Sequence, residues 1–144
     1  MKIQKQEYGI RARVALPYDE ALAKTKAALQ AEGFGVLSEI DMKAKLKEKL
    51  GVEIKQYMIL GACNPPLAYK AVQAEPEIGL LLPCNVIVYD AGDGATVISA
   101  IDPDSMSAVI GDNPEVEEVA RDARVRLERV IGAMRLAGGQ PVRS

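Results

Sequence analysis

The stretch GLLLPCNVIVYDAGDGATVISAI, residues 79–101, holds two apolar runs separated by a short polar segment. The runs Gly79–Tyr89 and Ala95–Ile101 are rich in β-branched residues, which are typical of strands. The segment 90–94 between them is composed of Asp, Gly and Ala, a composition that predicts a hairpin turn. Because the first run is apolar on both faces, we predict that it forms a central strand of a sheet.

The rest of the chain supplies three more strands and five helices. Alternation or apolar runs predict the strands, and apolar stripes at helical spacing predict the helices. Asx-Pro pairs and glycines mark several helix ends. The predicted strands are 9–16, 34–40 and 52–62, and the predicted helices are 18–32, 42–50, 65–73, 103–110 and 114–137.

This order of elements predicts an α+β fold. We expect one domain over residues 1–137, with a five-stranded, mainly antiparallel sheet whose helices pack on one face. Gly138 and Gly139 end the last predicted helix, so residues 138–144 are expected to form a flexible C-terminal tail.

Composition excludes several classes of function. The chain has no histidine, which rules out histidine-based triads, Cys-His dyads and histidine-ligated zinc or haem. Residues 1–72 carry 12 basic and 8 acidic side chains, whereas residues 73–144 carry 6 basic and 12 acidic ones. The net charge of -2 is therefore the sum of a positive first half and a negative second half. This pattern does not favour nucleic acid as a partner, because phosphate backbones are bound by clustered basic surfaces.

The sequence also indicates a location. Residues 1–7 are polar and do not resemble a secretory signal, and no apolar stretch reaches the length of a membrane span. Two cysteines are too few for a disulfide scaffold. We therefore expect a cytoplasmic protein that has no membrane partner.

Cys63 and Cys84 are the only cysteines, and each stands beside asparagine and proline. If the strands that carry them are neighbours, Cys63, Asn64, Cys84 and Asn85 could converge on one pocket. The thiols could then form a reversible disulfide, bind a soft metal such as Cu(I), or line a small-molecule site. Packed, inert thiols are the simpler interpretation, because cysteine is among the most buried residue types. Neither cysteine has the Cys-x-x-Cys spacing of a metal or redox motif, so no metal ligands are assigned and the cofactor is left undefined.

Two further residues are candidates for the rim of this pocket. Asp41 could pair with Glu39 as an acid–base couple, or it could simply cap the helix that follows. Tyr69 lies one turn after Pro65 and Pro66, on the side of the predicted helix that is near Cys63.

The chain resembles the domain of unknown function 302 family in four segments, which are GFGV (33–36), Ile40-Asp41, ILGACNPPLA (59–68) and GLLLPCNV (79–86). The similarity extends from about Tyr8 to Met134. It implies a TATA-binding-protein-like α+β fold and a homodimer, and it implies no activity.

Our leading hypothesis is a homodimeric ligand-binding or accessory domain with a thiol- and asparagine-lined pocket. The alternative is a thiol-dependent enzyme, or a redox or soft-metal protein, that uses Cys63 and Cys84. In the enzyme, Asp41 or Glu39 would carry protons and the asparagine amides would stabilise an oxyanion. A third reading is a dimer that only mediates interactions, in which the thiols serve stability alone.

Overall fold

The computed structural model describes residues 8–138, and its element order matches the prediction closely. The strands are β1 (Gly9–Val14), β2 (Gly35–Asp41), β3 (Tyr57–Cys63), β4 (Cys84–Gly92) and β5 (Ala95–Ile101). The helices are α1 (Tyr18–Ala31), α2 (Met42–Leu50), α3 (Pro65–Ala74), the 3-10 helix η1 (Pro76–Leu81), α4 (Pro103–Ile110) and α5 (Pro114–Ala137). Apart from Gly138, the predicted tail lies outside the described residues.

The five strands form one antiparallel sheet in the order β1-β5-β4-β3-β2. The prediction of an α+β fold with an antiparallel sheet is therefore confirmed, and β4 is its central strand. The turn between β4 and β5 needs left-handed backbone at Gly92, Asp93 and Gly94, which explains its Gly-Asp-Gly composition.

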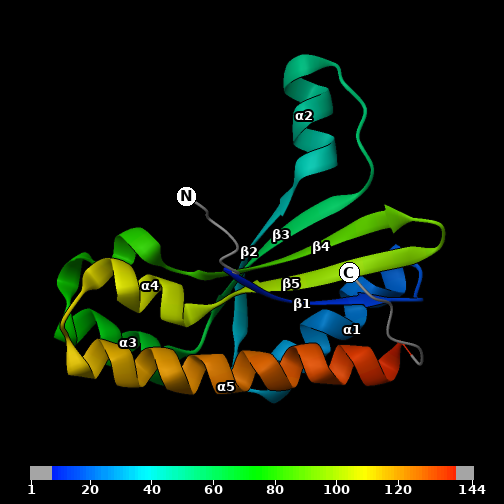
Figure 1. Cartoon of the computed structure of the whole chain (residues 1–144). Helices are drawn as coiled ribbons and strands as arrows, with labels where there is room; N and C mark the ends of the chain where they lie inside the picture. Colours follow the sequence, from blue (N-terminus) through cyan, green and yellow to red (C-terminus); the bar gives the residue numbers. More distant parts are fainter. Residues whose placement is uncertain (1–7, 139–144) are drawn as a thin grey trace, which may run out of the picture.

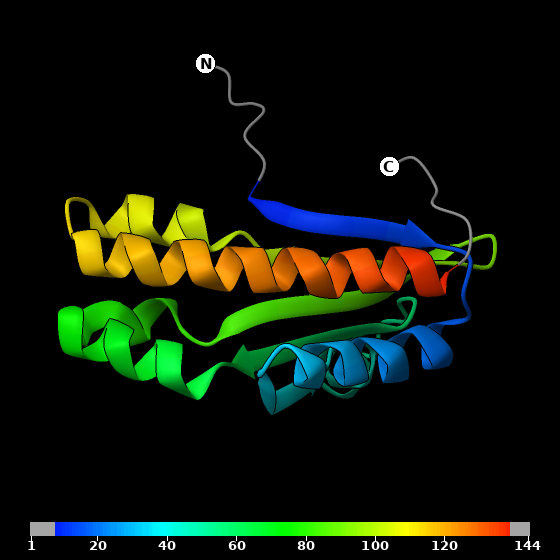
Figure 2. The same cartoon turned by 90° about the horizontal axis from the view of Figure 1, so that it is seen from below.

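Helices α1 and α5 cover one face of the sheet and enclose the main core (Figures 1 and 2). Leu60, Val86 and Ile98 point from the strands into this core, where they meet Leu29 of α1 and Leu127 of α5. Helix α2 projects on the other side of the sheet, and none of its side chains is fully buried (Figure 1).

Helix α5 is longer than the sheet that it covers, and its N-terminal half continues past the strand ends. There it lies beside α3 and α4, with η1 close to α3 (Figure 2). A second, smaller apolar cluster fills this region, centred on Ala71, Ile78 and Val116. The molecule thus has one core under the sheet and another beyond its end.

Two of the predicted strands begin later than expected. Residues 52–56 were expected in a strand, but β3 begins at Tyr57, and Lys43 and Lys47 of α2 hold the preceding segment through Glu53. Residues 79–82 were also expected in a strand, but they belong to η1 and its end, and the Leu82–Pro83 peptide is cis. Proline cannot donate a ladder hydrogen bond, so β4 starts after Pro83.

Candidate functional site

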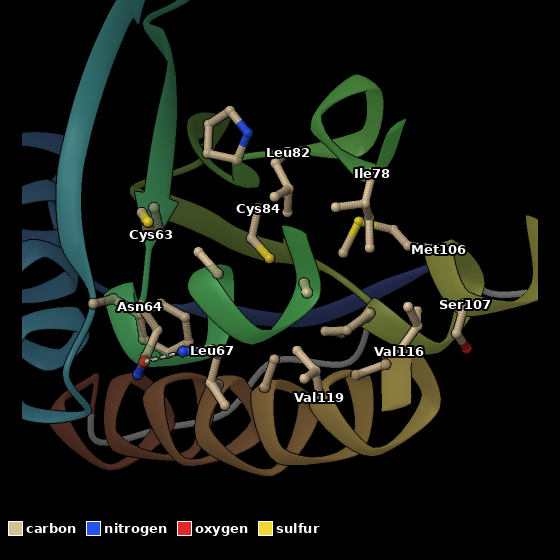
Figure 3. Close-up of a pocket in the computed structure, with 18 of the residues that line it drawn as sticks. Cys63, Asn64, Leu67, Ile78, Leu82, Cys84, Met106, Ser107, Val116 and Val119 are labelled. Atoms are coloured by element: carbon tan, nitrogen blue, oxygen red, sulfur yellow. Dashed lines mark hydrogen bonds between the residues drawn. The ribbon is translucent and has the colours of Figure 1, made fainter. Parts of the chain in front are cut away.

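A cavity of about 300 Å³ lies where the end of the sheet meets α3, η1, α4 and α5 (Figure 3). Its wall consists almost entirely of carbon, with two thiols, one amide and one hydroxyl among the side chains. The lining residues are Phe34, Leu37, Ala62, Cys63, Asn64, Leu67, Ala68, Ala71, Ile78, Leu82, Pro83, Cys84, Pro103, Met106, Ser107, Val116, Val119, Ala120 and Ala123.

Antiparallel pairing brings the two cysteine segments to this end of the sheet. Strand β3 finishes at Cys63 where β4 begins at Cys84, and Ala62 stands directly opposite Cys84 in the ladder. Each segment carries proline next to its strand, so pairing stops here and the chain turns into α3 or arrives from η1. The condition for convergence, that the two strands are neighbours, is therefore met.

Cys84 points into the cavity and is buried, with 8% of its surface exposed (Figure 3). Burial raises the pKa of its thiol from 9.0 to about 11, and Cys63 adds a smaller contribution in the same direction. Loss of water disfavours the charged form of a thiol. Cys84 is therefore a neutral, apolar wall group at neutral pH, a state that does not favour nucleophilic attack.

Cys63 is half-buried and does not approach Cys84 as a partner. Side chains alternate along a strand, so Cys63 and Ala62 leave β3 on opposite faces, and Cys63 borders the cavity from the strand end. The Cys84 sulfur points away from Cys63 in Figure 3, and both thiols are free. Within residues 8–138, no group of three or more Cys, Asp or Glu side chains is arranged to hold a metal ion.

Asn64 borders the cavity, but both polar atoms of its side chain form hydrogen bonds to the backbone. Its Oδ1 accepts a hydrogen bond from the Leu67 N–H at 3.4 Å, and its Nδ2 donates to the Glu32 carbonyl at 3.4 Å. The first bond caps α3, as the sequence predicts, and the second ties α3 to the turn after α1. Gly33 leaves room for this amide, since a Cβ there would lie 3.0 Å from Asn64 Nδ2.

The structure does not bring Asp41 to the cavity. Asp41 pairs with Met58 and Gly35 pairs with Cys63, so Asp41 is at the opposite end of the β2–β3 ladder. Cys63 is five steps along the strand from Met58, a distance of roughly 17 Å. Asp41 instead caps α2 by accepting from the Ala44 N–H at 2.9 Å, the simpler of its two sequence interpretations.

Glu39, Tyr69 and Asn85 also lie outside the cavity wall. Glu39 forms an ion pair with Lys26 at 2.9 Å. Tyr69 is 65% exposed, and its hydroxyl accepts a hydrogen bond from Gln73. Asn85 follows Cys84 in the strand and is therefore exposed on the other face of the sheet, opposite Gly61.

Much of the wall was not predicted as part of a site. Phe34 comes from the turn before β2, Met106 from α4, and Val119 and Ala120 from α5. These residues fit an ordinary apolar stripe, so periodicity predicts their burial but not the cavity between them. A usable signal is the Asx-Pro pair that starts each of α3, α4 and α5, because all three helix starts lie in this region.

No helix within residues 8–138 is both long and apolar enough to cross a lipid bilayer.

Comparison with known proteins gives a consistent family assignment. The model of the family described as "Domain of unknown function DUF302" matches residues 10–134. The crystal structure of an uncharacterized conserved DUF302 protein from Bacillus stearothermophilus is similar, with 29% sequence identity and a TM-score of 0.82. The similarity covers 90% of this chain and 100% of that one. A search of curated proteins gives no match.

Proposed function

This chain belongs to the DUF302 family, and we propose that it is a small-molecule-binding domain whose ligand occupies the cavity beyond the sheet end. The observation that carries the proposal is the cavity itself, about 300 Å³ of space walled by apolar side chains from five segments. Ligand pockets in proteins are concave, mostly apolar, and begin at about this volume.

The space is large compared with ordinary packing defects. Protein interiors contain few voids larger than a water molecule. A cavity of about 150 Å³ lined by aliphatic residues stays dry and binds benzene. The cavity here has about twice that volume, which by the same ratio would accommodate roughly a dozen carbon atoms.

Indole is a suitable first probe because it is neutral, and because the chain has no tryptophan that would contribute to its fluorescence. We expect the emission of indole to shift to the blue when it enters the apolar cavity. Ala120→Phe, which places a ring in the cavity, should weaken indole binding at least tenfold. Ala133→Phe is the matched control, since Ala133 is on the exposed side of the same helix.

Circular dichroism would confirm that Ala120→Phe is folded. Cys84→Leu provides a second, smaller filling of the same space from the strand side. If indole binds the wild-type protein no better than the folded Ala120→Phe and Cys84→Leu variants, the cavity is not its binding site and the proposal fails.

We also propose that two copies of this chain associate through the face of the sheet that α1 and α5 leave open. Ile40, Ile59 and Ile87 are on this face, where Ile40 is 42% exposed. Helix α2 projects on the same side and ends at the exposed Leu50, with the exposed Val52 two residues beyond (Figure 1). A second copy can offer the same apolar residues by two-fold symmetry.

Light scattering after size-exclusion chromatography tests this association. The wild-type protein should have the mass of two chains, and Ile87→Lys should have the mass of one. Lys45→Glu, on the polar side of α2, serves as a control for a change of charge. A wild-type protein that remains monomeric at high concentration would contradict the dimer without affecting the indole result.

A further inference from the structure

The residues that line the cavity indicate the charge of its ligand, if the cavity binds a small molecule as proposed above. We propose that the cavity selects an uncharged apolar molecule, such as an alkyl chain or aromatic ring with a neutral polar group, and excludes organic anions and cations of the same size.

The side chains of the wall offer no charge to a ligand. None of the lining residues is Asp, Glu, Lys or Arg. The amide of Asn64 is bonded to Leu67 and Glu32, and the Ser107 Oγ donates to the Asp104 carbonyl at 3.0 Å. The Cys84 thiol is the wall's buried titratable group, and its burial favours the neutral form. An ion that entered would lose its water without gaining a charged partner.

The helix starts around the cavity are also closed to anions. Helices α3, α4 and α5 all begin in this region, and three helix N-termini would normally attract negative charge through their free N–H groups. Here each helix begins with proline at its first position, which removes one donor.

Capping side chains then occupy a further donor in each helix. Asn64 accepts from the Leu67 N–H in α3, Asp102 from the Asp104 N–H in α4 at 3.0 Å, and Asn113 from the Val116 N–H in α5 at 3.2 Å. The pattern is the same at all three starts. A site built for phosphate or carboxylate would leave such donors free for the ligand.

The charged side chains at the start of α4 are paired with Arg124 of α5. Asp102 and Asp104 would repel an anion and attract a cation, but Arg124 binds their carboxylates at 2.7 and 3.1 Å. The guanidinium is itself shared with Glu128 at 3.1 Å. This cluster is a closed network beside the cavity, so it offers neither sign of charge to a ligand.

Three probes with the same hydrocarbon chain test the selectivity at pH 7.5: 1-octanol, octanoate and octylammonium. Competition with indole would measure their affinities for the full-length wild-type protein. We expect 1-octanol to displace indole and each ion to bind more than tenfold more weakly. If either ion binds within tenfold of 1-octanol, the selectivity is overturned while the binding function survives. If neither 1-octanol nor indole binds, both proposals fail.

A positive charge introduced into the cavity wall provides a second test of the selectivity against anions. Met106 lies on α4 with its side chain toward the cavity (Figure 3), so Met106→Lys would place a flexible ammonium group at the wall. Val109, on the same helix, is 72% exposed, and Val109→Lys is the matched control. Octanoate should gain at least tenfold in affinity with Met106→Lys and should not change with Val109→Lys. No gain in a folded Met106→Lys protein would mean that charge is not what excludes octanoate.

Discussion

The buried thiol of Cys84 should make the stability of the protein fall in mildly alkaline solution. The perturbation is a rise in pH from 8 to 11, with wild-type protein compared with Cys84→Ala under reducing conditions. The pKa of Cys84 is raised from 9.0 to about 11 in the folded protein. The unfolded chain therefore loses this proton first, and its ionisation favours unfolding as the pH rises above 9.

The size of the effect follows from the shift. One pKa unit corresponds to about 1.4 kcal/mol, so the contribution of Cys84 is fully present well below pH 9, and about 2 kcal/mol of it is lost by pH 11. The loss approaches about 3 kcal/mol only above pH 11. Urea unfolding followed by circular dichroism gives the free energy of unfolding at each pH. Lysine and tyrosine titrate in both proteins, so the difference between wild type and Cys84→Ala isolates the thiol. A difference that stays constant from pH 8 to 11 would refute the account of Cys84 as a desolvated, neutral group.

Three further substitutions test the packing around the cavity, each by urea unfolding against a matched control. Asn64→Ala should lower the free energy of unfolding by about 1–2 kcal/mol through loss of the α3 cap. Asn85→Ala, which removes an exposed side chain, should change it by less than about 0.5 kcal/mol. Equal effects of the two substitutions would contradict the capping role. Gly61→Ala should lower the free energy of unfolding by about 1–3 kcal/mol, because the new Cβ would collide with Ser38 Oγ and lie 2.9 Å from Pro83 Cγ. Gly79→Ala is the control, since it has open space around it. An unchanged free energy of unfolding in Gly61→Ala would show that the strands shift freely here. Arg124→Ala should lower the free energy of unfolding by about 1 kcal/mol, and by less in high salt, because its ion pairs with Asp102 and Asp104 are partly exposed. Arg121→Ala, at an exposed site on the same helix, should lower it by less. A loss that does not depend on salt would argue against an electrostatic origin.

The order of elements was predictable because local signals agree along most of the chain. The apolar stripe of α5 contains Val116, Ala120, Leu127 and Met134, all buried, and period alone predicts it. Sequence periodicity does not predict burial where the packing of a neighbouring helix decides which side chains are covered. Val109 is one of the apolar side chains of α4, yet it is 72% exposed, because α5 packs on another side of that helix.

The candidate site was predicted in part, and the failures have geometric reasons. Cys63, Asn64 and Cys84 meet because adjacent antiparallel strands bring the end of one to the start of the next. The same alternation that turns Cys84 inward turns Asn85 outward, so Asn85 is exposed on the other face of the sheet. Asp41 was placed at the wrong end, since strand length separates it from Cys63 by roughly 17 Å.

The three Asx-Pro helix starts show how one sequence feature serves both fold and site. Read locally, Asn64-Pro65, Asp102-Pro103 and Asn113-Pro114 are helix caps, and the structure confirms each of them. Only the fold reveals that each of these helix starts contributes a lining residue to one cavity, namely Asn64, Pro103 and Val116. The shared effect of the three caps is to remove or occupy N–H donors at helix starts, which would otherwise carry positive potential. Local capping chemistry thereby sets the polarity of a site that no local pattern could locate.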